Sequence, residues 1–393
     1  TVLLPLYYRL KLVSIYTYLK DRFGIVSYKT GSAFFIISKA IGAAFRLFLV
    51  ANVLHIGIFS LYKVPFVVTV LVTLILIWVY TFKSGIKTIV WTDSLQTLFM
   101  LASVIVSVYI IINKLDIQTE NIFSYIHQHE YSQIFNRDWQ SGRNFFKQFF
   151  AGAFIAVVMT GLDQDMMQKN LTCRNIKESQ KNMLWFSVAL LPVNLLFMSL
   201  GVFLYDYAQT LNIHMPESSD GLFPLLALKH FGLGAGIIFL LGIIAAAFSS
   251  ADSALTALTT AFCIDFLGVD IHKNEPKQRR TKRSVHIAFS VLLLFIIVIF
   301  RVINDESVVN AIFRVAGYTY GPLLGLFAFG LISKRMVRDK YVWISAIVSP
   351  VLTILIDMYS EPLLFGYKFG FEVIILNGLF MLVGLMFLSG KKK

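Results

Sequence analysis

One apolar stretch of the sequence, residues 245–265, carries hydroxyl groups and a carboxylate at helical spacing. Residues three and four positions apart share one face of a helix. Four hydroxyl residues fall on one such face: Ser249, Ser253, Thr256 and Thr260. Ser250 and Asp252 flank this face. Small hard cations prefer oxygen ligands, and hydroxyls beside freed backbone carbonyls can replace the water shell of Na⁺ in a transporter. The stretch therefore predicts a cation path.

A structural alternative exists for these hydroxyls. Ser and Thr in membrane helices often act as small packing residues, with the hydroxyl bonded to the carbonyl four residues earlier. We favour the cation path for the set as a whole, because an intramembrane carboxylate such as Asp252 is by default a functional candidate.

The composition indicates an all-α, polytopic membrane protein. Of the 393 residues, 57% are hydrophobic and only 15% are charged, which lies outside the range of soluble domains. Apolar runs of about 20 residues, the length that crosses a bilayer, predict ten helices. Their approximate bounds are 30–58, 64–82, 88–113, 146–168, 181–206, 234–264, 284–302, 307–332, 340–358 and 369–389.

The net charge of +13 could suggest a nucleic-acid partner, but the placement of the basic residues argues against one. Of the 35 Lys and Arg residues, 24 fall in loops on one side of the predicted helices and eight on the other. The rich side is therefore cytoplasmic, and the protein is expected in the cell membrane. Lys39, Arg46 and Arg314 fall within predicted spans and need a separate explanation.

Two polar external segments, residues 116–142 and 206–230, are predicted to cover the outer mouth. His127 and His129 in the first segment are more often solvated than metal-bound at this spacing, so no metal other than Na⁺ is expected. Cys173 and Cys263 have no metal-like spacing, and we assign them no disulfide.

Five ordered motifs resemble the solute:sodium symporter family, which contains the sodium/glucose, sodium/proline and sialic acid cotransporters. The motifs are YLKDRFG (18–24), WTDSLQT (91–97), LDQDMMQKNL (162–171), SSADS (249–253) and GYTYGPLLG (317–325). The resemblance covers nearly the whole chain. It implies two inverted five-helix repeats, the LeuT-like transporter fold, with ions and substrate near the bilayer midplane.

The resemblance also implies an organisation for the chain. We expect one transmembrane transporter domain over residues 1–393, with a cytoplasmic segment at 1–28, core helices at 30–332 and additional C-terminal helices at 338–393. The first core helix of the family pattern is expected to be missing, because the sequence begins near the end of the second.

The family pattern implies a main sodium site on the SSADS helix. Its ligands would be the carbonyl of Ala246 and the hydroxyls of Ser249 and Ser250. Some members have a second sodium site, and the matching residues here include Asp93, Asp252 and Ser253. Asp252 stands where those members have a serine, which changes the charge of that site and could favour a second cation or a proton.

The sugar-binding pattern of the glucose cotransporters is absent. Ala156, Met159 and Arg314 occupy positions that hold hydrogen-bonding side chains in those proteins, so a hexose is not expected. All three positions are candidates for binding a different substrate. Arg314 could hold a substrate carboxylate, with Lys39 and Arg46 as further candidates. Alternatively, Arg314 pairs with a carboxylate of the protein, such as Asp252 or Asp163.

Smaller predictions concern four further positions. Asp163 and Gln164 are predicted to form an inner gate or a helix cap, and Pro322 is predicted to kink its helix. Asp265 at a helix C-terminus opposes the helix dipole, which suggests a nearby Lys or Arg partner.

These observations predict a symporter in which an inward Na⁺ gradient drives uptake of a small, anionic organic solute by alternating access. The expected partners are the solute, Na⁺ as coupling ion and the lipid bilayer, with no cofactor and no nucleic acid. One alternative is a sensor domain of similar fold that binds solute for signalling. A membrane enzyme is a weaker alternative, because the histidines are scattered without partner spacing.

Overall fold

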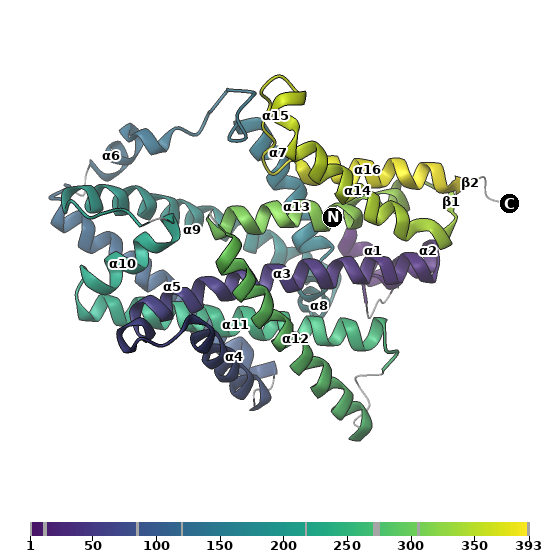
Figure 1. The fold of residues 1–393 in the computed structure, drawn as a ribbon, viewed down its shortest axis with the longest axis horizontal. Helices are drawn as coiled ribbons and strands as arrows, with labels where there is room; N and C mark the ends of the chain where they lie inside the picture. Colours follow the sequence, from purple (N-terminus) through teal and green to yellow (C-terminus); the bar gives the residue numbers. More distant parts are fainter. Residues whose placement is uncertain are drawn as a thin grey trace.

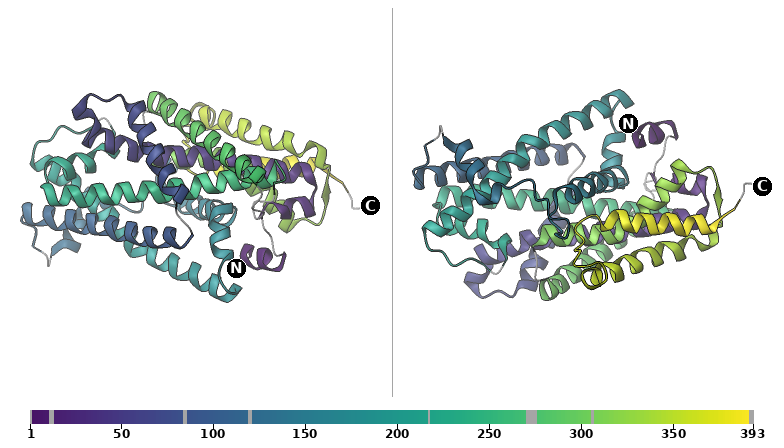
Figure 2. Two further views of the ribbon diagram at one scale, coloured as in Figure 1. Left: turned by 90° about the horizontal axis from the view of Figure 1, so that it is seen from below. Right: turned by 90° about the horizontal axis from the view of Figure 1, so that it is seen from above.

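The computed structural model describes residues 2–10, 14–83, 86–118, 121–216, 218–269, 276–304 and 307–390, and for residues 80–93, 168, 247 and 248 it describes no side chains. The described chain is helical, apart from one short antiparallel pair of strands, β1 (Met336–Val337) and β2 (Ser389–Gly390). Long helices run roughly side by side along the longest dimension of the molecule (Figures 1 and 2).

The helices in chain order are α1 (Leu3–Leu10), α2 (Thr17–Arg22), α3 (Ile25–Gly57), α4 (Phe66–Lys83), α5 (Ile86–Lys114), α6 (Ile122–Gln128), α7 (Phe145–Ala156), α8 (Gln164–Leu171), α9 (Ile176–Thr210), α10 (Leu222–Lys229), α11 (Leu233–Asp265), α12 (Pro276–Ile303), α13 (Val308–Ile332), α14 (Val342–Met358), α15 (Ser360–Leu363) and α16 (Val373–Leu388). A π-helical turn, η4, covers Val157–Gly161. Short 3-10 turns lie at Phe59–Tyr62, Glu130–Ser132, Ser219–Gly221 and Asp339–Tyr341.

Each apolar segment predicted from the sequence coincides with a helix, with one correction. The segment predicted as a continuous helix over residues 146–168 is instead broken after η4, and its two parts meet at a bend of 65°. Within the described residues, seven helices are long and apolar enough to cross a membrane, or eight if the bent pair counts as one span. The number of spans and the missing first helix therefore stay predictions.

Helix α3 runs through the middle of the molecule and contacts α11, α12 and α13 (Figure 1). Small residues such as Ala43 and Ala44 are buried on it, which lets neighbouring backbones approach closely. Its N-terminus is capped from a distant part of the chain. The carboxylate of Asp339 accepts hydrogen bonds from the backbone N–H groups of Val26 and Ser27 at 2.9 and 2.8 Å.

Helices α13 and α16 pack closely through small residues. Pro322 lies inside α13 and has no N–H group to bond the carbonyl of Tyr318. The side-chain amide of Asn377 on α16 donates to that carbonyl at 2.7 Å and to the carbonyl of Gly317 at 3.0 Å. A Cβ atom at Gly321 would lie 2.2 Å from the Asn377 side chain, so only glycine allows this approach.

The close approach predicts a large cost for Gly321→Ala. The added methyl would push Asn377 off the carbonyls that it bonds, and such overpacking typically costs about 1–3 kcal/mol. Gly201→Ala is the matched control, because a Cβ atom at Gly201 on α9 meets nothing within 4 Å. We expect a clear fall in the unfolding temperature of the purified protein for the first variant and no fall for the second. Equal unfolding temperatures for the two variants would contradict the close packing of Gly321 against Asn377.

Candidate functional site

A cavity of about 270 Å³ lies among α3, α8, α11, α13 and the η4 turn. It brings together several residues that the sequence singled out: Lys39, Arg46, Met159, Ser249, Ser250 and Ser253. Asp165 and Lys169 also line it, although the sequence reasoning did not name them. Their four-residue spacing within the LDQDMMQKNL motif was the available signal.

Other predicted site residues do not line this cavity. Ala156, Ala246, Asp252 and Arg314 lie outside its lining. Asp93 belongs to α5, but its side chain lies outside the described residues. The predicted pairing of Asp93 with Asp252 therefore stays a prediction.

The break between η4 and α8 places two carboxylates in the cavity wall. Backbone groups freed by the break have partners: Tyr7 donates to the carbonyl of Gly161 at 2.9 Å, and Tyr16 donates to that of Leu162 at 2.7 Å. Asp163 then caps α8 by accepting from the N–H groups of Asp165 and Met166. The cap predicted for Asp163 is therefore confirmed.

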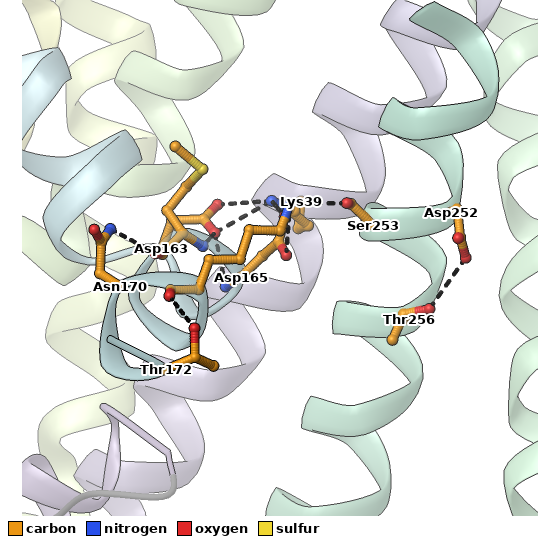
Figure 3. A network of polar contacts seen from close by, with 10 residues as sticks. Lys39, Asp163, Asp165, Asn170, Thr172, Asp252, Ser253 and Thr256 are labelled. Atoms are coloured by element: carbon orange, nitrogen blue, oxygen red, sulfur yellow. Dashed lines mark hydrogen bonds and ion pairs between the residues drawn. The ribbon is translucent and has the colours of Figure 1, made fainter. Parts of the chain in front are cut away.

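Lys39 of α3 forms a buried ion pair with these carboxylates (Figure 3). Its ammonium lies 3.0 Å from Asp163 and 3.2 Å from Asp165, and the Lys39 and Asp163 side chains are only 8% and 5% exposed. Tyr320 of α13 also donates to Asp163 at 3.3 Å. A charge buried in a membrane protein must be paired, and Lys39 is therefore satisfied by the protein itself.

Arg46 lies on the same helix as Lys39, about two turns further along, and its exposed side chain lines the cavity. Among the residues that the structure describes, none forms a hydrogen bond or ion pair with Arg46. The cavity lining contains three cationic and two anionic side chains. Because Lys39 and Lys169 contact the two carboxylates, Arg46 carries the excess positive charge.

Ser249 and Ser250 line the cavity, and the hydroxyl of neither has a hydrogen-bond partner within the described part of the chain. Serines elsewhere in the helices commonly bond back by four residues, as Ser187 does to Met183 at 2.9 Å. That back-bond is the ordinary way for a helical hydroxyl to be satisfied. Its absence here leaves both oxygens available to a ligand.

Ser253 and Asp252 point to different sides of α11 (Figure 3). Ser253 faces α8, where its hydroxyl accepts a hydrogen bond from Lys169 at 2.9 Å. Asp252 is buried, 2% exposed, and accepts from Thr256 on its own helix at 3.4 Å. Successive residues of a helix are rotated by about 100°, so the two side chains lie on different faces of α11. The second cation site predicted from Asp93, Asp252 and Ser253 stays a prediction.

Arg314 pairs with a protein carboxylate, as one of its two predicted alternatives had it, but the carboxylates named as examples were wrong. Among the described residues its guanidinium pairs with Asp357 of α14 at 3.3 Å, and not with Asp252 or Asp163. Tyr318, one turn along α13, donates to the same carboxylate and accepts from Arg314. The Asp163 carboxylate is already held by Lys39. Arg314 thus lies in a polar cluster between α13 and α14, outside the cavity lining.

The predicted basic partner of Asp265 was also wrong. Its buried carboxylate accepts hydrogen bonds from the hydroxyls of Tyr28 and Ser32 on α3. No Lys or Arg pairs with it within the described ranges of the chain. Hydroxyl donors satisfy the carboxylate and tie the end of α11 to α3.

His129 of the first external segment docks onto α9. Its Nε2 atom lies 2.9 Å from Asp206, and Tyr125 donates to the other oxygen of that carboxylate at 2.7 Å. Burial, with the Asp206 bond, raises the pKa of Tyr125 to about 12. Among the described residues, no three His, Cys, Asp or Glu side chains gather as a metal site.

Comparison with known proteins identifies the class of this transporter. Residues 1–348 match the model of the sodium:solute symporter family. The chain is 25% identical over 386 residues to a sodium/sialic acid symporter of Proteus mirabilis, covering 93% of this chain and 73% of that protein. It is 23% identical over 358 residues to a sodium/sialic acid symporter of Aliivibrio fischeri, covering 90% and 70% of the two chains.

Two further similarities are also to sodium-coupled transporters. The human sodium/iodide cotransporter is 23% identical over 338 residues, covering 84% of this chain and 51% of that protein. A solved Na⁺-coupled sialic acid symporter, in a substrate-bound outward-open state, matches with a TM-score of 0.78 at 20% identity, covering 99% of this chain and 80% of that one. At this identity the structural match establishes the fold alone.

The chain belongs to the sodium:solute symporter family. It is a multi-pass membrane transporter that couples solute import to Na⁺, with no enzymatic cofactor implied. The family resemblance and the transporter fold predicted from the sequence are therefore confirmed, and the sensor alternative gains no support from these transporter relatives.

The buried ion pair makes a stability prediction. Lys39→Met should strand the buried carboxylate of Asp163, and breaking a buried pair from one side typically costs about 3–5 kcal/mol. Lys368→Met is the control, because Lys368 pairs with Glu361 where both side chains are 61% exposed, and such pairs contribute about 0.2–1 kcal/mol. Thermal unfolding of both purified variants measures the difference. A Lys39→Met protein as stable as the control would contradict the buried pair.

Proposed function

We propose that the transported solute is a small organic anion and that Arg46 binds its negative charge. The observation that carries this proposal is that Arg46 is the cavity cation with no carboxylate partner among the described residues. An arginine can hold a carboxylate through two parallel hydrogen bonds. Lys39 is less suited to this role, because Asp163 and Asp165 already neutralise it. Met159 contributes an apolar wall.

The names of the relatives support an anionic solute. They include symporters of sialic acid, iodide and monocarboxylates. The cavity of about 270 Å³ is close to the lower end of small-molecule sites, roughly 300–1,000 Å³, and is much larger than a halide ion needs. We therefore take a carboxylated sugar such as sialic acid as the first candidate, and a short monocarboxylate as the second.

For the coupling ion, we infer a sodium site formed by the hydroxyls of Ser249 and Ser250 and the carbonyl of Ala246. The two hydroxyls lie in the same cavity as Arg46 and have no partner within the described chain. An anion at Arg46 and a cation at the serines would attract each other across one cavity. Each ligand would then favour the conformation that binds the other, which is how binding at two sites becomes coupled.

We further infer that residues 1–393 form one transmembrane transporter domain. Contacts between the predicted core and C-terminal helices support this inference, because α13 packs along α16 and contacts α14. The break before α8 supports a role for that helix in gating, since discontinuous helices commonly form the binding sites and moving parts of secondary transporters.

Substitution of Arg46 tests the anion site. Arg46→Gln removes a charge-assisted contact worth about 1.5–3 kcal/mol, so the KM for sialic acid should rise roughly 10- to 150-fold. Arg46→Lys keeps the charge but loses the two parallel hydrogen bonds of an arginine. Its KM for sialic acid should lie between those of the unsubstituted protein and Arg46→Gln. Uptake into proteoliposomes, with a monocarboxylate assayed in parallel, measures these values.

The same experiment contains its own control for folding. Because no protein carboxylate depends on Arg46 among the described residues, Arg46→Gln should unfold at the temperature of the unsubstituted protein. Unchanged uptake of both acids by Arg46→Gln would contradict the proposed anion site.

Substitution of Ser250 tests the sodium site. Ser250→Ala removes one proposed ligand and should raise the Na⁺ concentration for half-maximal uptake at least several-fold. Ser187→Ala is the control, because the Ser187 hydroxyl is bonded to its own helix backbone on α9. If Ser250→Ala and Ser187→Ala show the same Na⁺ dependence at normal expression, Ser250 is not a ligand.

A further inference from the structure

Lys169 connects α8, the helix with the proposed gating role, to the row of hydroxyls on α11. It lies on α8, half exposed, and its ammonium donates to the Ser253 hydroxyl at 2.9 Å. The Asp165 carboxylate, one turn earlier on α8, lies 3.6 Å from the same ammonium. Lys169 and Ser253 both line the cavity that contains Ser249 and Ser250. A protein cation therefore already contacts the Ser253 hydroxyl, the second of the four in the predicted cation path.

An ammonium group and Na⁺ compete for the same feature of a hydroxyl. Both carry one positive charge and both bind the oxygen lone pairs, the ammonium by donating a hydrogen bond and Na⁺ by coordination. Two cations placed within a few ångströms of one oxygen repel strongly in a partly buried site. Binding of Na⁺ at Ser253 therefore requires that Lys169 leave.

Lys169 is able to leave this position. Its side chain is 53% exposed, and an exposed lysine loses little on breaking such contacts. Its flexible stem of four carbons lets the charge swing away, in contrast to the enclosed Lys39. The contact is thus a reversible one that bridges α8 and α11.

We propose that Lys169 is a tethered cation that excludes a second sodium ion from Ser253. While the bridge is formed, the cavity takes Na⁺ only at Ser249 and Ser250. This inference rests on the proposed sodium site and deepens it, because Lys169 then sets the number of ions that bind. The bridge also joins α8 to α11, so displacement of Lys169 would release the two helices from each other.

The direct test is a count of bound Na⁺ in purified protein, measured with radioactive sodium. The unsubstituted protein should bind one ion, and Lys169→Gln, which removes the charge at similar size, should bind two. Adding Ser253→Ala to Lys169→Gln should return the count to one. Lys169→Arg keeps the charge and should still bind one. Lys177→Gln, an exposed lysine at the start of α9, is the control and should behave as the unsubstituted protein.

A second measurement uses the unsubstituted protein and does not depend on the folding of variants. At Na⁺ concentrations well above those of the ion count, Na⁺ should displace Lys169 from Ser253. The reaction of Lys169 with an amine-selective reagent, followed by mass spectrometry, should then quicken several-fold in Na⁺ relative to choline. The reaction of Lys177 should not change.

The outcomes separate the two proposals. Two results together would overturn the tethered-cation inference while leaving the first sodium site intact. They are a Lys169→Gln protein that binds one ion, and an unsubstituted protein whose Lys169 reacts at the same rate in Na⁺ and in choline. An unsubstituted protein that binds no Na⁺ would instead overturn the proposed sodium site itself.

Discussion

Charges inside a membrane protein must neutralise one another, and the pairing of Lys39 with Asp163 and Asp165 is the interaction on which the site depends. It joins the central helix α3 to the N-terminus of the short helix α8. Without this pairing, the break after η4 would leave the largely buried carboxylates of Asp163 and Asp165 without the ammonium of Lys39. Lys39 and Arg46 of α3 therefore differ. Lys39 forms a structural ion pair with the protein's own carboxylates, whereas Arg46 lines the cavity without a carboxylate partner among the described residues.

A similar difference occurs along α11. Ser249 and Ser250 line the cavity, Ser253 accepts a hydrogen bond from Lys169, and Asp252 lies on another side of the helix. The hydroxyls of this row look alike in the sequence, but in the structure some have a hydrogen-bond partner and others have none among the described residues. Under the proposed sodium and anion sites, a small number of ions binds close to one anion. The proposed role of Lys169 gives α8, which carries it, control over access to the row.

The sequence predicted much of the fold, because long apolar runs and the bias of basic residues are strong signals. It did not predict the bend at Leu162, since a π-helical turn leaves no mark in hydropathy and the tyrosines that satisfy it come from residues 7 and 16. The site was predicted in part. Arg46 and the serines were named, but Asp357 was not foreseen as the partner of Arg314, because it lies 43 residues away on another helix.

The central claim is that this cavity couples a Na⁺ gradient to the import of an organic anion. Its most direct test is to measure the uptake of labelled sialic acid into proteoliposomes over time, with an inward Na⁺ gradient and, for comparison, with an equal K⁺ gradient. The account predicts transient accumulation above the external concentration with Na⁺ only, and its loss when a Na⁺ ionophore dissipates the gradient. Equal uptake under the two gradients, or no accumulation of any carboxylate tested, would contradict it.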